Sequence, residues 1–127
     1  CVCVCVCVCV CVRVCVCVGC HLQSNQGFYG RGAYFADRAA YSNYTYAHHL
    51  DSGRAGGRRQ LLLARVLCGR FHDFGQEVSF RTRSLRKPPS DGQHSVCGGP
   101  HGTEPSRMWV VYDRAQVYPA YIVTYTE

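Results

Sequence analysis

The first 20 residues alternate cysteine and valine almost without interruption, and this alternation constrains the possible folds more than any other feature of the sequence. The block contains nine Cys, nine Val, one Arg and one Gly. Residues two apart point to the same face of a β-strand, and β-branched valines are poor helix material. The block is therefore expected to form a sticky β-segment. Because Arg13 is its one charged residue, such a segment is an aggregation hazard.

The cysteines of this block fit neither a disulfide framework nor a zinc site. Of the 11 cysteines in the chain, Cys68 and Cys97 alone lie outside it. Cysteines two apart on a strand are separated by roughly 6.5–7 Å, at the edge of disulfide reach. Structural zinc sites need a ligand pair on a turn and a second pair after a spacer. Strict alternation provides neither arrangement, so we expect no metal site here.

A repetitive DNA origin accounts for the whole block. A TG dinucleotide repeat read in frame encodes Cys-Val without end, and Arg13 and Gly19 are each one base change from a cysteine codon. We therefore interpret residues 1–20 as low-complexity, artefactual sequence, joined through residues 21–26 to a domain at 27–127. The block lacks the flanks of a secretory signal, and its alternation argues against a transmembrane helix, so no membrane contact is expected.

The remaining 107 residues carry all eight acidic residues and 13 of the 14 basic ones, which gives a net charge of +5. This length suits one small domain or part of a larger one. Three apolar runs predict strands, at residues 61–68, 108–112 and 117–125. The first run is almost continuously apolar, which predicts a strand buried on both faces.

A further strand and one helix are expected near the start of this domain. Residues 33–36 (AYFA) predict a short strand, and Asp37 is expected to N-cap a helix over residues 38–46. The predicted fold class is α+β, with a β-dominated core and one short helix.

Two basic segments rich in glycine or proline, residues 51–59 and 81–103, predict solvent-facing loops. Clustered arginines suggest binding to phosphate groups. However, neither segment interleaves aromatic residues with its charges, as a single-strand nucleic-acid platform does. Nucleic-acid binding through this part of the chain is therefore not expected.

The run at residues 27–46 is the strongest candidate for a binding site. Gly27, Gly30 and Gly32 permit close backbone approach and positive φ. They precede a strand and lack a Gly-Lys-Ser/Thr triplet, so they match neither a dinucleotide fingerprint nor a Walker loop. Several residues could provide aromatic faces and a hydroxyl for a flat heteroaromatic amide: Tyr34, Tyr41, Tyr44, Tyr46 and Ser42. Alternatively, the tyrosines pack against a sheet.

These residues also carry a family resemblance. YGRGAYFA at 29–36, followed by AYS at 40–42, resembles the YGKGxYFA…YS signature of the PARP-type ADP-ribosyltransferases. Three other stretches resemble family motifs in order and spacing: LLLARVLCGRF at 61–71, Pro88-Pro89 and MWVVYDRAQVYPAYIVTYTE at 108–127. The likeness covers about residues 27–127. It is closest to mono-ADP-ribosylating members, including those with CCCH zinc fingers and WWE domains.

The resemblance implies a transferase that moves ADP-ribose from NAD, as a substrate, to a protein acceptor while nicotinamide leaves. Tyr34 matches the tyrosine that stacks on nicotinamide, and Ser42 the serine that hydrogen-bonds its carboxamide. Gly32 and Ala36 match small neighbours that allow close packing. Family members act inside cells, in the nucleus or cytoplasm, and the resemblance implies the same location here.

Two departures from the family pattern concern the site itself. The second stacking aromatic of the family falls at Thr45, so Tyr44 or Tyr46 must substitute for it. The third member of the His-Tyr-Glu triad falls at Met108. A thioether is a weak hydrogen-bond acceptor and cannot polarise a hydroxyl as a carboxylate does. The resemblance therefore implies transfer of single ADP-ribose units rather than chain elongation.

The triad histidine is missing from its expected place before the tyrosine. His101-Gly102-Thr103 has the right triplet in the wrong position, and His48, His49 and His72 are interpreted as solvated or supporting residues. We expect the N-terminal part of the catalytic domain to be absent and the isolated chain to be inactive. The alternative is a non-catalytic module that binds nicotinamide or ADP-ribose, or a protein partner.

Overall fold

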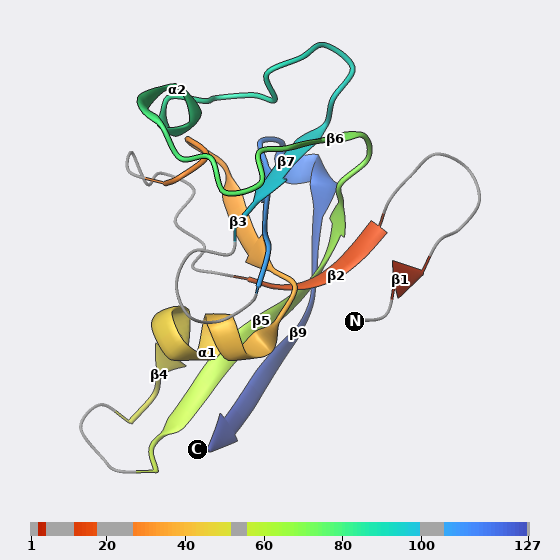
Figure 1. Ribbon diagram of the computed structural model, residues 1–127. Coiled ribbons are helices and arrows are strands. Elements are labelled where there is room, and N and C mark those ends of the chain that lie inside the picture. Colours follow the sequence, from red (N-terminus) through yellow and green to blue (C-terminus); the bar gives the residue numbers. More distant parts are fainter. Residues whose placement is uncertain (1–2, 5–11, 18–26, 52–55, 100–105, 127) are drawn as a thin grey trace.

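The structure, a computed structural model, describes residues 3–4, 12–17, 27–51, 56–99 and 106–126 (Figure 1). It is dominated by β-strands, which confirms the predicted α+β class. The prediction of one short helix is wrong, because the described residues form two, α1 (Ala39–Tyr46) and α2 (Phe80–Arg83), and a 3₁₀ turn, η1 (Arg114–Gln116). Neither α-helix is long and apolar enough to cross a membrane, in the parts of the chain described.

The strands form one continuous hydrogen-bonded network. Its main path runs in the order β4 (His48–His49), β5 (Arg58–Leu67), β2 (Val12–Cys17), β3 (Ala33–Ala36), β8 (Met108–Val111), β7 (Ser95–Gly98) and β6 (Phe71–Asp73). Two more strands pair off this path, β1 (Cys3–Val4) with β2 and β9 (Val117–Thr126) with β5. The β6–β7 pair is parallel and the other pairs are antiparallel.

Part of the Cys-Val repeat is a central strand of this network. Val16 of β2 lies opposite Ala36 of β3 on one side and opposite Leu63 of β5 on the other. The alternating segment thus forms the strand that joins β4 and β5 on one side to β3, β8, β7 and β6 on the other (Figure 1). Its origin in repetitive DNA stays a prediction.

The long strands β5 and β9 run side by side over nearly their whole length (Figure 1). The prediction that the first apolar run is buried on both faces is wrong. Ala64 and Val66 are fully buried, whereas Arg65 and Leu67 between and after them are exposed. Since successive side chains of a strand point to opposite faces, β5 covers a core on one face only.

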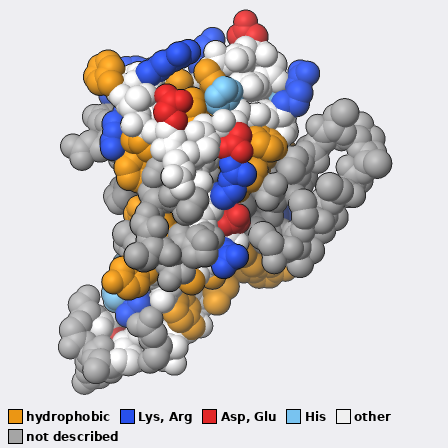
Figure 2. All heavy atoms as spheres, viewed as in Figure 1, with side chains coloured by type: hydrophobic (Ala, Val, Ile, Leu, Met, Phe, Trp, Pro, Cys, Tyr) orange, Lys and Arg blue, Asp and Glu red, His pale blue; other side chains and the backbone are white. Residues whose placement is uncertain are grey.

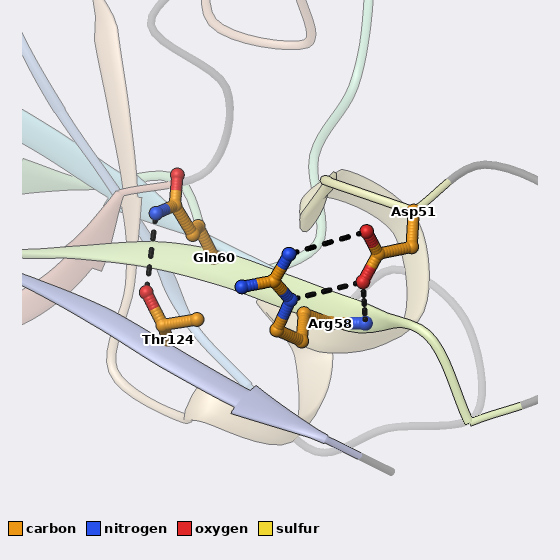
Figure 3. Close-up of polar contacts among 4 residues, drawn as sticks. All are labelled: Asp51, Arg58, Gln60 and Thr124. Atoms are coloured by element: carbon orange, nitrogen blue, oxygen red, sulfur yellow. Dashed lines mark hydrogen bonds and ion pairs between the residues drawn. The ribbon is translucent and has the colours of Figure 1, made fainter.

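Figure 3 shows the polar contacts that border the first half of β5. The guanidinium of Arg58 lies 3.0 Å from the carboxylate of Asp51, and the Gln60 amide donates to the hydroxyl of Thr124 on β9 at 3.1 Å. Both contacts are solvent-exposed. Exposed ion pairs contribute about 0–1 kcal/mol, so the β5–β9 ladder depends mainly on its backbone hydrogen bonds and apolar side chains.

Strand β8 is the centre of the packing, because all four of its residues are buried. Trp109 and Val111 belong to one apolar cluster, and Met108 and Val110 to a second. The first cluster also contains Phe35, Ala64, Val66, Cys68 and Cys97. The second also contains Tyr29, Ala36, Tyr41 and Val96. Cys68 is fully buried and packs as a small core residue.

Strand β7 lies inside a segment predicted to be a solvent-facing loop, so that prediction is wrong for residues 95–98. All four residues of β7 are buried, and Cys97 lies opposite Trp109 of β8. The cause is non-local, because β8 and β6 pair with β7 on its two edges. Helix α2 shortens the same predicted loop from its other end.

The predicted N-cap at Asp37 is also wrong. The helix α1 is preceded by Arg38, which makes no side-chain cap hydrogen bond. Asp37 instead accepts hydrogen bonds from the Ser106 hydroxyl at 2.9 Å and the Arg107 backbone N–H at 3.0 Å. Its carboxylate therefore fixes the chain that enters β8, a contact between residues far apart in the sequence.

Candidate functional site

The glycines before β3 form a tight turn that supports Tyr34. Gly30 has a φ of +75°, and a Cβ at this position would overlap the backbone carbonyl of Leu85. That carbonyl accepts a 2.9 Å hydrogen bond from the N–H of Arg31. A Cβ at Gly27 would overlap the Tyr34 hydroxyl. The predictions of positive φ and close backbone approach are therefore confirmed, at Gly30 and Gly27 respectively.

The small residues Gly32 and Ala36 are both buried at the two ends of β3. A Cβ on Gly32 would lie 2.7 Å from the Val111 carbonyl oxygen, closer than real Cβ atoms approach. Ala36 is fully buried in the second core cluster, opposite Met108. Their small size thus permits close packing of β3 on β8.

Tyr34 is half-buried, and its hydroxyl is used within the protein. The hydroxyl donates to the Gly30 carbonyl at 2.7 Å and accepts from the Tyr29 N–H at 2.9 Å. Burial raises the pKa of Tyr34 to about 12. The group is therefore neutral near pH 7, and it anchors the glycine turn. The ring, rather than the hydroxyl, remains for contact with a ligand.

Ser42 lies on α1 with no exposed surface, and its hydroxyl has no hydrogen-bond partner among the residues that the structure describes. Helix α1 packs against β2 and β3, so this hydroxyl is enclosed on the helix side that faces the sheet. Leaving a buried hydroxyl unpaired costs about 1–3 kcal/mol. Within the described part of the chain, Ser42 is thus a buried polar group whose hydroxyl is unsatisfied.

The two tyrosines proposed as a second stacking ring differ in exposure. The side chain of Tyr44 is 87% exposed and Tyr46 is 41% exposed. The ring of Tyr46 lies 6.1 Å from that of Tyr41 at an angle of 42°. The structure therefore brings Tyr46, and not Tyr44, beside the aromatic cluster under α1. The side chain of Thr45 lies outside the described residues.

Met108 is a core residue in the structure. It is 2% exposed, and its Sδ atom accepts a 3.7 Å hydrogen bond from the Tyr41 hydroxyl. Burial raises the pKa of Tyr41 to about 12, so this hydroxyl stays protonated near neutral pH. A thioether that is enclosed in this way is available neither as a base nor as an acceptor for a substrate hydroxyl.

Sequence reasoning missed Tyr29 and Tyr112, which hold the turn in place. The Tyr112 hydroxyl donates to the Tyr29 carbonyl at 2.8 Å, and burial raises the pKa of Tyr112. The ring of Tyr29 stacks on Phe74 at 5.4 Å. The position of Tyr112 at the end of the apolar run at 108–112 was the available signal, since a buried tyrosine usually finds a partner for its hydroxyl.

Three grooves formed by described residues include none of the side chains of Tyr34, Ser42 and Tyr46 in their linings. The first, of about 330 Å³, includes Ala33 and Phe35, which alternate with Tyr34 and point to the opposite face of β3. The second lies beside Leu67 and Tyr118, and the third is described below. A ligand that reaches Ser42 therefore needs space between α1 and the sheet that these grooves do not provide.

The histidines do not gather near Tyr34 in the described part of the chain. His48 and His49 are exposed on β4, and the ring of His72 packs 4.4 Å from Phe74. The strand beside β3, Val12–Cys17, contains no histidine. His101-Gly102-Thr103 lies outside the described residues. Among described residues, no group of three or more His, Cys, Asp or Glu could hold a metal ion.

Most of the chain is similar to part of known proteins. No family model matches the chain. It is 34% identical over 100 residues to protein mono-ADP-ribosyltransferase PARP12 of Mus musculus, and 34% identical over 98 residues to its counterpart in Homo sapiens. Each match covers 77% of this chain but 12% and 13% of those proteins, respectively. The chain therefore contains a region that is similar to part of a protein mono-ADP-ribosyltransferase.

Proposed function

We propose that residues 27–127 belong to a PARP-type mono-ADP-ribosyltransferase catalytic domain and that Tyr34, Ser42 and Tyr46 receive the nicotinamide ring of NAD. The observation that carries this proposal is the fully buried Ser42 hydroxyl without a partner. The carboxamide of nicotinamide offers the acceptor and donors that this hydroxyl lacks. The similarity to PARP12 supports the same proposal.

NAD would be the substrate whose nicotinamide leaves, with a protein side chain as the acceptor. In this proposal the residues of the chain orient the nicotinamide: the half-buried ring of Tyr34 lies against its face, and Ser42 bonds its amide. Such groups favour the reaction by positioning and by stabilising the charge that develops as the bond breaks.

The same geometry suggests that this chain transfers little or no ADP-ribose by itself. Met108 is enclosed where a carboxylate would be needed for chain elongation. The strand beside β3 provides valine and cysteine and no imidazole. Because Ser42 has no exposed surface, a ligand reaches its hydroxyl only when the surrounding structure opens, which weakens binding in proportion to the population of the open state.

A second candidate is a non-catalytic module that binds nicotinamide or ADP-ribose. It is favoured by the combination of an unsatisfied Ser42 with an apolar residue at position 108. Both candidates use the same side chains, and they differ in whether a covalent product forms. A location in the nucleus or cytoplasm is part of the first proposal.

Thermal unfolding with and without nicotinamide tests the site. A ligand at about 100 times its dissociation constant stabilises the folded state by about 2.7 kcal/mol. We expect a rise in Tm for the full chain, and loss of that rise in Ser42→Ala with no fall in the Tm of the unliganded protein. Ser90→Ala, an exposed serine, is the control. An equal rise in wild type and Ser42→Ala would overturn the assignment.

Incubation with labelled NAD and an acidic acceptor protein separates the two candidates. Acceptor labelling that is weak but detectable, and that Tyr34→Ala abolishes, would support the first candidate. The second predicts a Tm shift with no label on any protein. Labelling that is unchanged in Tyr34→Ala would contradict both.

A further inference from the structure

A groove of about 560 Å³ lies at the end of the sheet where β5 and β8 end and β7 begins. Its apolar lining includes Leu67 and Pro88, together with Tyr112. Leu67 is 41% exposed, which is unusual for a leucine at the end of a core strand. The volume is within the range of ligand pockets. We refer to it as the 86–94 groove, after the loop that forms one wall.

The wall of the 86–94 groove is positively charged. Arg86 and Lys87 line it, and both are exposed. Neither forms an ion pair with any residue that the structure describes. Arg81 and Arg83 on the preceding helix α2 are exposed too. Figure 2 shows basic side chains gathered over the end of the molecule where Figure 1 places α2.

The groove has one acidic side chain, Asp113, and it is already engaged. Its carboxylate accepts the 2.9 Å hydrogen bond from the Ala115 N–H that caps η1. The carboxylate forms no ion pair with Arg86 or Lys87, both of which lie in the described part of the chain. The positive charges of Arg86 and Lys87, beside the apolar surface of Leu67, are complementary to a ligand that contains both carboxylates and apolar side chains.

The walls are fixed by hydrogen bonds before any ligand binds. The side-chain amide of Gln116 donates to the carbonyls of Leu67 and His94, each at 2.9 Å. The Nδ1 atom of His94 accepts a 3.1 Å hydrogen bond from the Arg70 N–H. A preformed groove binds with a smaller loss of conformational entropy than a mobile one.

From this geometry we propose that the 86–94 groove binds an acidic peptide segment of a partner protein, with carboxylates on Arg86 and Lys87 and an apolar side chain against Leu67. A nucleic acid fits less well. The lining of the groove has a single tyrosine, Tyr112, whereas a single-strand nucleic-acid site stacks successive bases on several aromatic side chains. The proposal does not depend on NAD binding or on transferase activity.

Fluorescence anisotropy on the full chain tests the proposal. The probe is a labelled peptide that alternates glutamate with leucine, and the comparison peptide has glutamine in place of glutamate. We expect the glutamate peptide to bind at least tenfold more tightly. The double variant Arg86→Gln/Lys87→Gln should lose that advantage, and Leu67→Ser should weaken binding of the leucine-containing peptide about threefold or more. Circular dichroism verifies that each variant is folded.

A charge-matched control separates a site from general electrostatics. Arg38→Gln/Arg65→Gln removes two exposed arginines that do not line this groove and should change the affinity less than twofold. An equal loss in this control would overturn the proposal, because it would show attraction to net charge alone. So would equal binding of the two peptides, or tighter binding of a single-stranded oligonucleotide that the double variant also abolishes.

Discussion

The hydroxyl of Tyr41 on α1 donates a hydrogen bond to the sulfur of Met108 on β8 at 3.7 Å, and this contact joins the helix to a buried strand. Position 108 is 2% exposed and surrounded by apolar side chains. The Met108 side chain therefore serves to pack the core, and placing a carboxylate at position 108 should lower the free energy of unfolding.

Met108→Glu should destabilise the fold and should not create transferase activity. An uncompensated charge in this cluster costs on the order of 3–5 kcal/mol, so the variant should unfold at much lower urea concentration than wild type. Met108→Leu keeps the volume but removes the acceptor of the Tyr41 hydroxyl, so it should cost about 1–3 kcal/mol. Urea unfolding measures both. A Met108→Glu variant as stable as Met108→Leu would show that the site is open to water.

Tyr34→Phe should cost about 1–3 kcal/mol, because it leaves the Tyr29 N–H without its acceptor and the Gly30 carbonyl without its donor. Tyr44→Phe, at a residue 87% exposed, should change stability by less than about 0.5 kcal/mol. Chemical denaturation of the two variants side by side tests this. Equal effects would mean that the glycine turn does not need the Tyr34 hydroxyl.

Gly30→Ala should be far more damaging than Gly75→Ala, although both glycines have positive φ, +75° and +58°. Alanine in this region costs roughly 1–2 kcal/mol by itself. At Gly75 no atom lies within 4 Å of an added Cβ, whereas at Gly30 it would overlap the Leu85 carbonyl. The midpoint of thermal unfolding should fall more for Gly30→Ala. A similar fall for both would contradict the packing of the turn on the loop after α2.

Asp37→Ala should loosen the entry to β8 rather than the start of α1. The substitution removes the acceptor for Ser106 and for the Arg107 N–H, at a cost of about 1–3 kcal/mol. Hydrogen exchange should quicken at the amides of residues 107–109 before those of α1. Asp51→Ala, at an exposed ion pair, is the control and should cost less than about 1 kcal/mol. Faster exchange confined to the amides of α1 would instead indicate that Asp37 caps this helix.

Alkaline pH should unfold the protein through its buried tyrosines. Burial raises the pKa of Tyr29, Tyr34 and Tyr41 from 10.0 to about 12. A folded-state pKa above the unfolded value stabilises the fold fully below about pH 10, and that stability is lost as the pH rises through about 12. Circular dichroism and tyrosinate absorbance should change together in this window. Complete tyrosine ionisation near pH 10 with unchanged dichroism would contradict the burial.

Local sequence patterns predicted the strands that carry their own apolar runs. AYFA at 33–36 forms β3, and MWVV at 108–111 forms β8, whose four residues are all buried. They did not predict β7, because SVCG at 95–98 is short and lies among prolines, glycines and charges. Its burial comes from pairing with β8 and β6.

The sequence alone named the residues of the candidate site, but it did not predict which of their side chains face the sheet. The sequence pointed to Ser42 and the tyrosines around it, yet only the rotation of α1 separates exposed Tyr44 from Tyr46, which packs beside Tyr41. Asp37 shows the same limit. A capping residue and a residue that binds a distant strand have the same local sequence signal, and tertiary contacts decide between them.

Strand β2 lies between β3 and β5, and its sequence alternates with a period of two residues. A slide of the strand by two residues returns valine and cysteine to the same faces, so within β2 Arg13 alone distinguishes one register from the next. A gene copy that gained or lost a whole Cys-Val unit would still offer the neighbouring strands an equivalent partner. Alleles of different repeat length would then converge on a single architecture.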